Sequence, residues 1–197
     1  MINLFSIKEN SNYQIEIKNS KFIGCLFKIN SKEEVTQLLE TVKNTYKDAT
    51  HYCYAYVLED SQKASDDGEP GGTAGMPILN VLQSNNLINV LAVVIRYFGG
   101  IKLGAGGLVR AYSKCVKETL DHNEIIMLEK GINVIIYFSY ENVKDIDYLL
   151  KNEIINDKEY NELIKYNINI SEEKLLEIKD LIVNYQVIKD IYIEKHL

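Results

Sequence analysis

The spacing of apolar and polar positions predicts two strands and a helix in the first third of the chain. The runs Tyr13 to Lys18 and Phe22 to Ile29 are rich in β-formers and predict strands. Ser31 and Glu34 follow at the spacing of a capping box, and the apolar stripe from Val35 to Tyr46 continues at helical period. The pattern therefore indicates a strand, a strand and a helix in that order.

Two further strands and two helices are predicted in the middle of the chain. His51 to Leu58 is rich in aromatic and β-branched residues, and Leu87 to Phe98 is almost continuously apolar, as in a strand buried on both faces. One helix should end near Asn85, with Thr73 as its candidate cap. Another carries one apolar stripe from Leu108 to Thr119.

The pattern after Glu129 predicts a separate small domain. Strands are expected at Ile132 to Phe138, Glu153 to Tyr160, Ile164 to Ile170 and the final QVIKDIYIE, with helices at Val143 to Leu150 and after the cap Ser171. The order βαββαβ is that of the ferredoxin-like split βαβ unit. We therefore predict an α+β protein with an N-terminal domain over residues 1–128 and a ferredoxin-like domain over residues 129–197.

Composition narrows the class of protein. The 197 residues are 46% hydrophobic, which is enough for one ordinary core or two small ones. The longest apolar run, Leu87 to Ile95, is about half of the ~20 residues that a membrane helix needs, and the N-terminus lacks the features of a secretory signal. Three cysteines without close pairs argue against disulfides. We expect a cytoplasmic protein with no membrane partner.

Charge is unevenly distributed along the chain. The net charge of −6 argues against a protein that coats nucleic acid through bulk electrostatics. Yet no acidic residue occurs from Pro70 to Lys117. This span holds the cations Arg96, Lys102, Arg110, Lys114 and Lys117. Positive potential is therefore expected around its glycine cluster.

Two glycine-rich stretches are the candidate site, and we expect them to meet: SDDGEPGGTAGMPIL from Ser65 and RYFGGIKLGAGGLVRAY from Arg96. Glycines permit positive φ and close backbone approach, and free amides at the start of the next helix can bind anions. The predicted anion- or nucleic-acid-binding residues are Arg96, Tyr97, Gly99, Gly100, Lys102, Gly104, Gly106, Gly107 and Arg110. The alternative is that the glycines serve only turns and helix packing.

The acidic loop with Asp66, Asp67, Glu69 and Thr73 allows three interpretations. The carboxylates could hold Mg²⁺ against a bound phosphate, since hard oxygen ligands suit that metal. They could instead form a solvated turn, or pair internally with Arg96 or Arg110.

Other chemistry has little support in the sequence. His51 and Cys53 share a strand face as zinc ligands can, but no second close pair completes a site, so core packing is expected. No nucleophile elbow, P-loop or zincin motif occurs, and no catalytic residue is assigned. The tyrosines near the glycine clusters should be mostly core, although an exposed one could stack a base.

Four motifs resemble those of the bacterial YigZ/IMPACT family: SKFI at Ser20, ATHYCYAY at Ala49, DDGEPGGTAGMPIL and RYFGGIKLGAGGLVRAY. The resemblance implies an N-terminal domain similar to the second domain of small-subunit ribosomal protein S-five, a fold shared with GHMP kinases. It implies a C-terminal domain similar to the last domain of elongation factor G. Eukaryotic relatives regulate translation during amino-acid starvation but carry a further domain, and the resemblance supplies no catalytic residue.

Three functional hypotheses follow. The first is a non-enzymatic, translation-linked factor that binds RNA or a ribosomal surface through Arg96, Lys102, Arg110 and exposed tyrosines. The second is an enzyme or sensor of a small phosphorylated ligand, in which the acidic loop recruits Mg²⁺. The third is a protein-interaction module in stress regulation.

Overall fold

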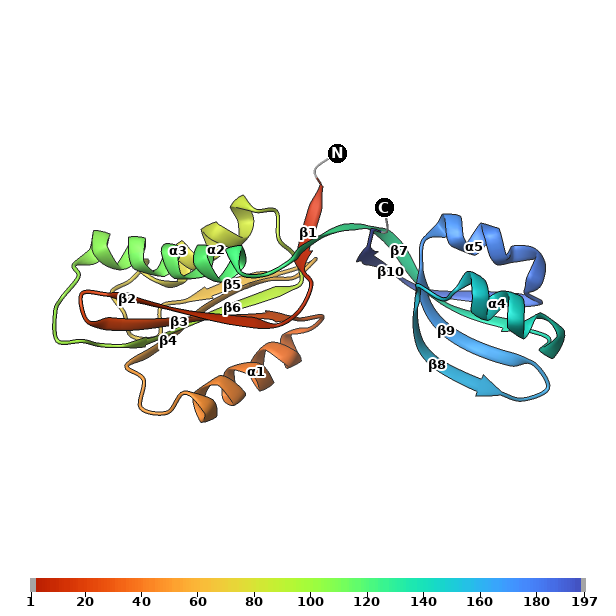
Figure 1. Cartoon of the computed structure of the whole chain (residues 1–197), viewed down its shortest axis with the longest axis horizontal. Helices are drawn as coiled ribbons and strands as arrows, with labels where there is room; N and C mark the ends of the chain where they lie inside the picture. The colour runs from red at the N-terminus through yellow and green to blue at the C-terminus, as the bar shows by residue number, and fades with distance from the viewer. Residues whose placement is uncertain (1–2, 196–197) are drawn as a thin grey trace. The chain divides into compact units, whose positions relative to one another are not determined.

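The computed structural model describes residues 3–195, and its chain divides into two compact units, Met1–Met127 and Leu128–Leu197 (Figure 1). Within the described residues there are five α-helices and two sheets. The structure is thus the two-domain α+β protein that the pattern predicts. Each unit is described by itself below.

A five-stranded antiparallel sheet forms the centre of the first unit. Its strands are β2 (Ser11–Ile17), β3 (Ser20–Lys28), β4 (His51–Val57), β5 (Gln62–Ser65) and β6 (Val90–Tyr97). The spatial order is β2-β3-β6-β4-β5, so β6 is the middle strand, as its apolar run indicates. A short strand, β1 (Leu4–Ile7), bridges to Leu87 through Phe5.

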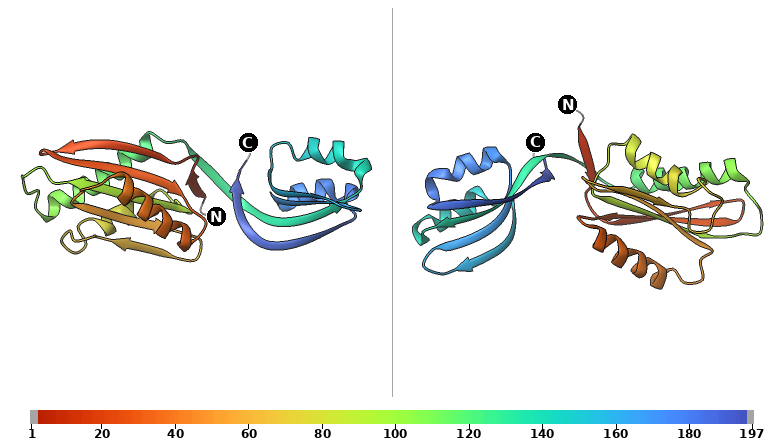
Figure 2. Two further views of the ribbon diagram at one scale, coloured as in Figure 1. Left: turned by 90° about the horizontal axis from the view of Figure 1, so that it is seen from below. Right: turned by 180° about the vertical axis from the view of Figure 1, so that it is seen from behind.

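Three helices cover the two faces of this sheet. Helix α1 (Lys32–Thr45) lies on one face, and α2 (Gly75–Ser84) and α3 (Ala105–Asp121) lie on the other (Figure 2). The start of α1 is the predicted cap, because Oγ of Ser31 accepts a hydrogen bond from the backbone N–H of Glu34. The Glu34 carboxylate in turn accepts from the backbone N–H of Asn30.

Strand β6 supplies both cores because its side chains alternate between the two faces. Val90, Ala92 and Val94 pack with α2 and α3, whereas the intervening apolar side chains pack with α1. Arg96 continues the first series and Tyr97 the second. Strand β6 therefore directs the charged side chain of Arg96 beneath α2 and α3, where the candidate functional site lies.

The second unit has the predicted βαββαβ order. Its elements are β7 (Ile125–Phe138), α4 (Val143–Leu149), β8 (Ile154–Tyr160), β9 (Ile164–Ile170), α5 (Glu172–Ile178) and β10 (Asn184–Glu194), with short 3₁₀ turns at Tyr140–Asn142 and Lys179–Leu181. The antiparallel strands lie in the order β10-β7-β9-β8. Its core joins the inward faces of β7 and β9 to both helices.

Two local expectations differ from the structure. The stretch from Glu59 to Glu69 was expected to be a loop, but its segment Gln62–Ser65 is the edge strand β5 and pairs with β4. Thr73 does not cap α2, because its Oγ1 donates to the backbone oxygen of Pro70. The cap is supplied by a residue of the acidic loop, described next.

Candidate functional site

The two glycine-rich stretches line one cavity of about 400 Å³ in the first unit. The first turn of α3 closes one side, and the ends of β4 and β6 close another. The lining residues are Thr50, His51, Glu69, Pro70, Arg96, Phe98, Lys102, Leu103, Gly104, Ala105 and Leu108. The structure therefore brings the acidic loop and the cationic loop to the same place.

Asp66 fixes the acidic loop at the start of α2. Its Oδ1 accepts hydrogen bonds from the backbone N–H groups of Ala74 and Gly75, and its Oδ2 accepts from Gly72, at 2.8–2.9 Å. Burial opposes the charged form, but the three backbone donors outweigh it and lower the pKa of Asp66. The N-terminus of α2 is thus capped by a carboxylate of the same chain, which is the negative charge that a helix N-terminus favours.

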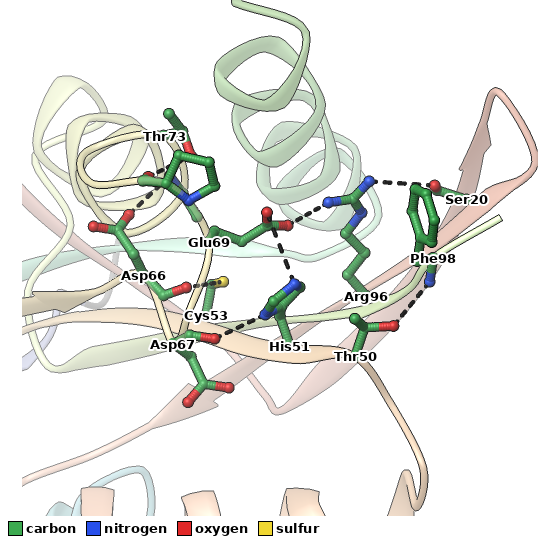
Figure 3. A network of polar contacts seen from close by, with 12 residues as sticks. Ser20, Thr50, His51, Cys53, Asp66, Asp67, Glu69, Thr73, Arg96 and Phe98 are labelled. Atoms are coloured by element: carbon green, nitrogen blue, oxygen red, sulfur yellow. Dashed lines mark hydrogen bonds and ion pairs between the residues drawn. The ribbon is translucent and has the colours of Figure 1, made fainter. Parts of the chain in front are cut away.

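Glu69 joins the acidic loop to the middle strand. Its Oε1 lies 2.5 Å from Nη1 of Arg96 (Figure 3). The same oxygen accepts a hydrogen bond from the Tyr112 hydroxyl at 2.7 Å. Both charged side chains are at least nine-tenths buried. This is the internal pairing considered among the alternatives for the loop. Arg96 is consequently a partner of Glu69 and does not present a free charge to the cavity.

The Arg96 guanidinium is held from several sides. It lies 5.4 Å from the ring centroids of Phe22 and Phe98, and Nη2 lies 3.5 Å from Oγ of Ser20. Its Nε has no hydrogen-bond partner among the described residues. Phe22 is fully buried, whereas Phe98 is 45% exposed beside the cavity.

Small polar side chains fix the end of β6 where it enters the glycine loop. Oγ of Ser20 accepts a hydrogen bond from Gly99 N–H, and Oγ1 of Thr50 accepts one from Phe98 N–H. A side chain at Gly99 would overlap the backbone of Asn19. The serine of SKFI and the threonine of ATHYCYAY therefore position the loop.

His51 lies beside Glu69 in the cavity. Its Nδ1 is 2.8 Å from the backbone oxygen of Asp67, and its Nε2 is 3.9 Å from Oε2 of Glu69 (Figure 3). On the same strand, Cys53 donates its S–H to the backbone oxygen of Asp66, and burial raises its pKa to about 12. Neither residue has the surroundings of a metal ligand.

The start of α3 opens into the cavity without a cap. Gly104 has a φ of +72°, a left-handed conformation that favours glycine, and its position offers no side chain to the helix. The first N–H groups of α3 lack intrahelical partners by helix geometry. Lys102 is exposed on the lining, and Nη1 of Arg110 lies 3.7 Å from the place of a Cβ at Gly106.

The remaining residues that were predicted for the site differ in their position relative to the cavity. Tyr97 packs toward α1 and donates its hydroxyl to the backbone oxygen of Lys47, so it does not line the cavity. Gly100 has a φ of +85° in the loop, and Gly106 and Gly107 lie in the first turn of α3. Thr50 and Phe98 line the cavity although neither was predicted to, and His51, which was expected to pack in the core, lines it as well.

The three carboxylates of the acidic loop have separate partners. Asp66 caps α2, Glu69 pairs with Arg96, and Oδ2 of Asp67 accepts a hydrogen bond from the N–H of Tyr52. Within residues 3–195, no group of three or more His, Cys, Asp or Glu side chains is placed to hold a metal ion.

No helix within residues 3–195 is long and apolar enough to cross a membrane.

Comparisons with known proteins agree on one family. The model of the Impact N-terminal domain matches residues 18–120. IMPACT family member YvyE of Bacillus subtilis is 40% identical over 89% of this chain and 81% of its own length. IMPACT family member YigZ of Escherichia coli is 46% identical over 53% of this chain, which is 54% of that relative.

A solved structure extends the similarity to both units. It is described as the crystal structure of a hypothetical protein, is 31% identical, and matches over 91% of each chain with a TM-score of 0.67. The matched domain contains every residue that lines the cavity. The chain belongs to the IMPACT family.

Proposed function

We propose that this protein is a translation-linked factor that binds the phosphate backbone of single-stranded RNA, free or on the ribosome, at the cavity before α3. The link to translation rests on the family, whose eukaryotic members regulate translation. The proposal places the protein in the cytoplasm. The chemistry rests on the cavity alone.

The observation that carries the proposal is the difference between the two helix starts. Asp66 occupies the start of α2, while the start of α3 faces the cavity with no capping side chain and with Lys102 beside it. A phosphate oxygen fits there, because both the helix terminus and the ammonium group favour an anion. Glu69 neutralises Arg96, so Lys102 is the cation of the lining with no ion pair among the described residues.

Each contact is expected to contribute a modest binding free energy, and the contacts together should be sufficient for binding. A helix N-terminus contributes roughly 0.3 to 1 kcal/mol to anion binding at exposed sites, and up to about 2 kcal/mol when partly buried. A base that stacks on the exposed face of Phe98 would add roughly 1 to 3 kcal/mol. Arg110 lies close enough to the first turn to contact a neighbouring phosphate.

A second candidate is favoured by the size of the cavity. At about 400 Å³ it falls within the range of roughly 300 to 1,000 Å³ that small-molecule sites occupy. A small phosphorylated ligand, with Mg²⁺ bound to its own phosphates, would use the same contacts. Thermal stabilisation by nucleotides, with and without MgCl₂, tests this candidate.

The experiment for RNA measures the fluorescence anisotropy of a labelled single-stranded RNA over a series of salt concentrations. Loss of one phosphate contact should lower the slope of log affinity against log salt by about 0.7. Lys102→Ala should show that change. Lys114→Ala, at a lysine that is equally classed as exposed but lies within α3 and outside the lining, is the matched control.

Three results would count against RNA binding. They are affinity that does not depend on salt, equal slopes for the two variants, and no binding at all. A protein partner that copurifies and survives nuclease treatment would instead favour the interaction module.

A further inference from the structure

Two polar atoms at the cavity have hydrogen-bonding capacity that no other described residue uses. Nε2 of His51 and Oε2 of Glu69 both belong to lining residues and lie 3.9 Å apart, which is too far for a direct hydrogen bond. Neither atom has another hydrogen-bond partner among the described residues. The Glu69 side chain is 4% exposed, so little of this carboxylate reaches solvent at the cavity wall.

The tautomer of His51 follows from its other contact. A backbone carbonyl can only accept, so the 2.8 Å contact with Asp67 requires a proton on Nδ1. The neutral ring then has its lone pair on Nε2, next to Glu69. Because the tautomer and the ring orientation are both fixed, Nε2 is prepared to accept a proton.

Glu69 would stabilise the imidazolium that forms. Its Oε1 is held by Arg96 and Tyr112, so its Oε2 cannot move away from His51 without breaking those bonds. A fixed carboxylate beside a ring that takes up a proton is an electrostatic partner already in position, and it needs no reorganisation during the reaction. Arg96 and Tyr112 act here only as positioning residues.

We propose that His51 is the general base of a metal-independent RNA-cleaving site in this cavity. The inference rests on the proposed binding of RNA phosphate at the start of α3. His51 Nε2 takes the proton of a ribose 2′-hydroxyl, and the 2′-oxygen forms a bond to the adjacent phosphorus. The bond from phosphorus to the 5′-oxygen breaks, and that oxygen takes a proton from water. The products are a 2′,3′-cyclic phosphate and a 5′-hydroxyl end.

The other lining groups have matching roles. Lys102 and the N–H groups of α3 would stabilise the charge that builds on the phosphate oxygens. Phe98 would hold the base on one side of the scissile bond. The reaction consumes no cofactor and no metal ion, and the proton on His51 returns to solvent.

The test uses a single-stranded DNA oligonucleotide that carries one ribonucleotide. The full-length protein should cleave it at that position, and the all-DNA strand should bind without being cleaved. His51→Ala and His51→Gln should each lose at least about 100-fold in cleavage rate, the usual lower range for removing a general base. Both should retain binding of the all-DNA strand. His122→Ala, at an exposed histidine that stacks on Tyr13 outside the lining, is the matched control.

A pH profile adds a readout that a purely structural histidine would not give. The cleavage rate of the natural protein should depend on pH, because a base must lose its proton before it can act, and this dependence should be absent from any residual activity of His51→Gln. The glutamine amide stands in for Nε2 but cannot take up a proton, so this variant removes proton transfer while a polar side chain remains at the position.

The outcomes distinguish the catalytic inference from the binding function on which it rests. Binding without cleavage by the natural protein, or equal cleavage by the His51 variants purified in parallel, overturns the catalytic inference and leaves the binding function intact. Failure to bind these strands and the labelled single-stranded RNA overturns both proposals.

Discussion

Oε1 of Glu69 lies 2.5 Å from Nη1 of Arg96, and this contact joins the loop before α2 to the end of β6. The residues are separated by 27 positions in the sequence, and the pair is buried between the sheet and α3. The contact orders the cavity wall. Its removal should therefore affect both stability and the position of His51.

We expect Glu69→Ala to lower the free energy of unfolding by about 3–5 kcal/mol, because a buried guanidinium is left without its carboxylate. Urea denaturation measures the change. The double variant Glu69→Ala with Arg96→Met should be less destabilised than the single variant, since it leaves no unpaired charge. A double variant as unstable as the sum of both singles would contradict this explanation.

Asp66→Ala should destabilise the protein by roughly 0.5–2 kcal/mol at neutral pH, as expected for a lost helix cap. The folded pKa of Asp66 is lowered from 3.8, so its contribution is full above that value and declines as pH falls through the folded pKa. The difference in unfolding free energy between the natural protein and the variant should therefore shrink in acid. A difference that does not shrink as the pH falls below 3.8 would exclude this role.

Gly99→Ala should destabilise the first unit by about 1–3 kcal/mol, because the added methyl group overlaps the backbone of Asn19. Gly71→Ala is the matched control in the other glycine stretch. A Cβ at Gly71 meets nothing within 4 Å, and its φ is not positive. Thermal unfolding of both variants measures the loss of stability. Equal losses for Gly99→Ala and Gly71→Ala would contradict the explanation that the backbone of Asn19 approaches Gly99 closely.

The thiols of Cys53 and Cys115 should react with a disulfide reagent only when the protein unfolds. Burial raises the pKa of each to about 12, so the reactive thiolate is almost absent at pH 8. Labelling rates should therefore follow denaturant concentration. Because the unfolded thiol ordinarily ionises near 9.0, these groups should also reduce stability as pH rises above that value. Rapid labelling of the folded protein would contradict the burial argument.

Strong periodicity in the sequence predicted most of the fold. The apolar run of β6 and the caps at Ser31 and Ser171 are local signals, and the structure confirms them. Strand β5 was missed because QKAS is short and polar, as edge strands often are. The beginning of β7 was missed because Glu129 and Lys130 interrupt its apolar pattern.

The candidate site was predicted less completely, because it depends on which face of a strand a residue occupies. Arg96 and Tyr97 are neighbours in sequence, yet one lies beneath α3 and the other packs toward α1. His51 pairs with Arg96 across the sheet, a register that composition does not reveal. Lys102 and Gly104 of the cationic span line the cavity, whereas the pairing of Arg96 with Glu69 required coordinates.

The start of α2 is capped by Asp66, whereas the start of α3 has no capping side chain, and this difference has a practical consequence. An acidic residue at position 102 could interact with the start of α3 and occupy the place of the proposed phosphate at the same time. If the proposal holds, selection for heat resistance alone would favour variants that no longer bind this phosphate, so that stability is gained at the expense of binding. Engineering of this domain should keep Lys102 fixed and seek added stability elsewhere.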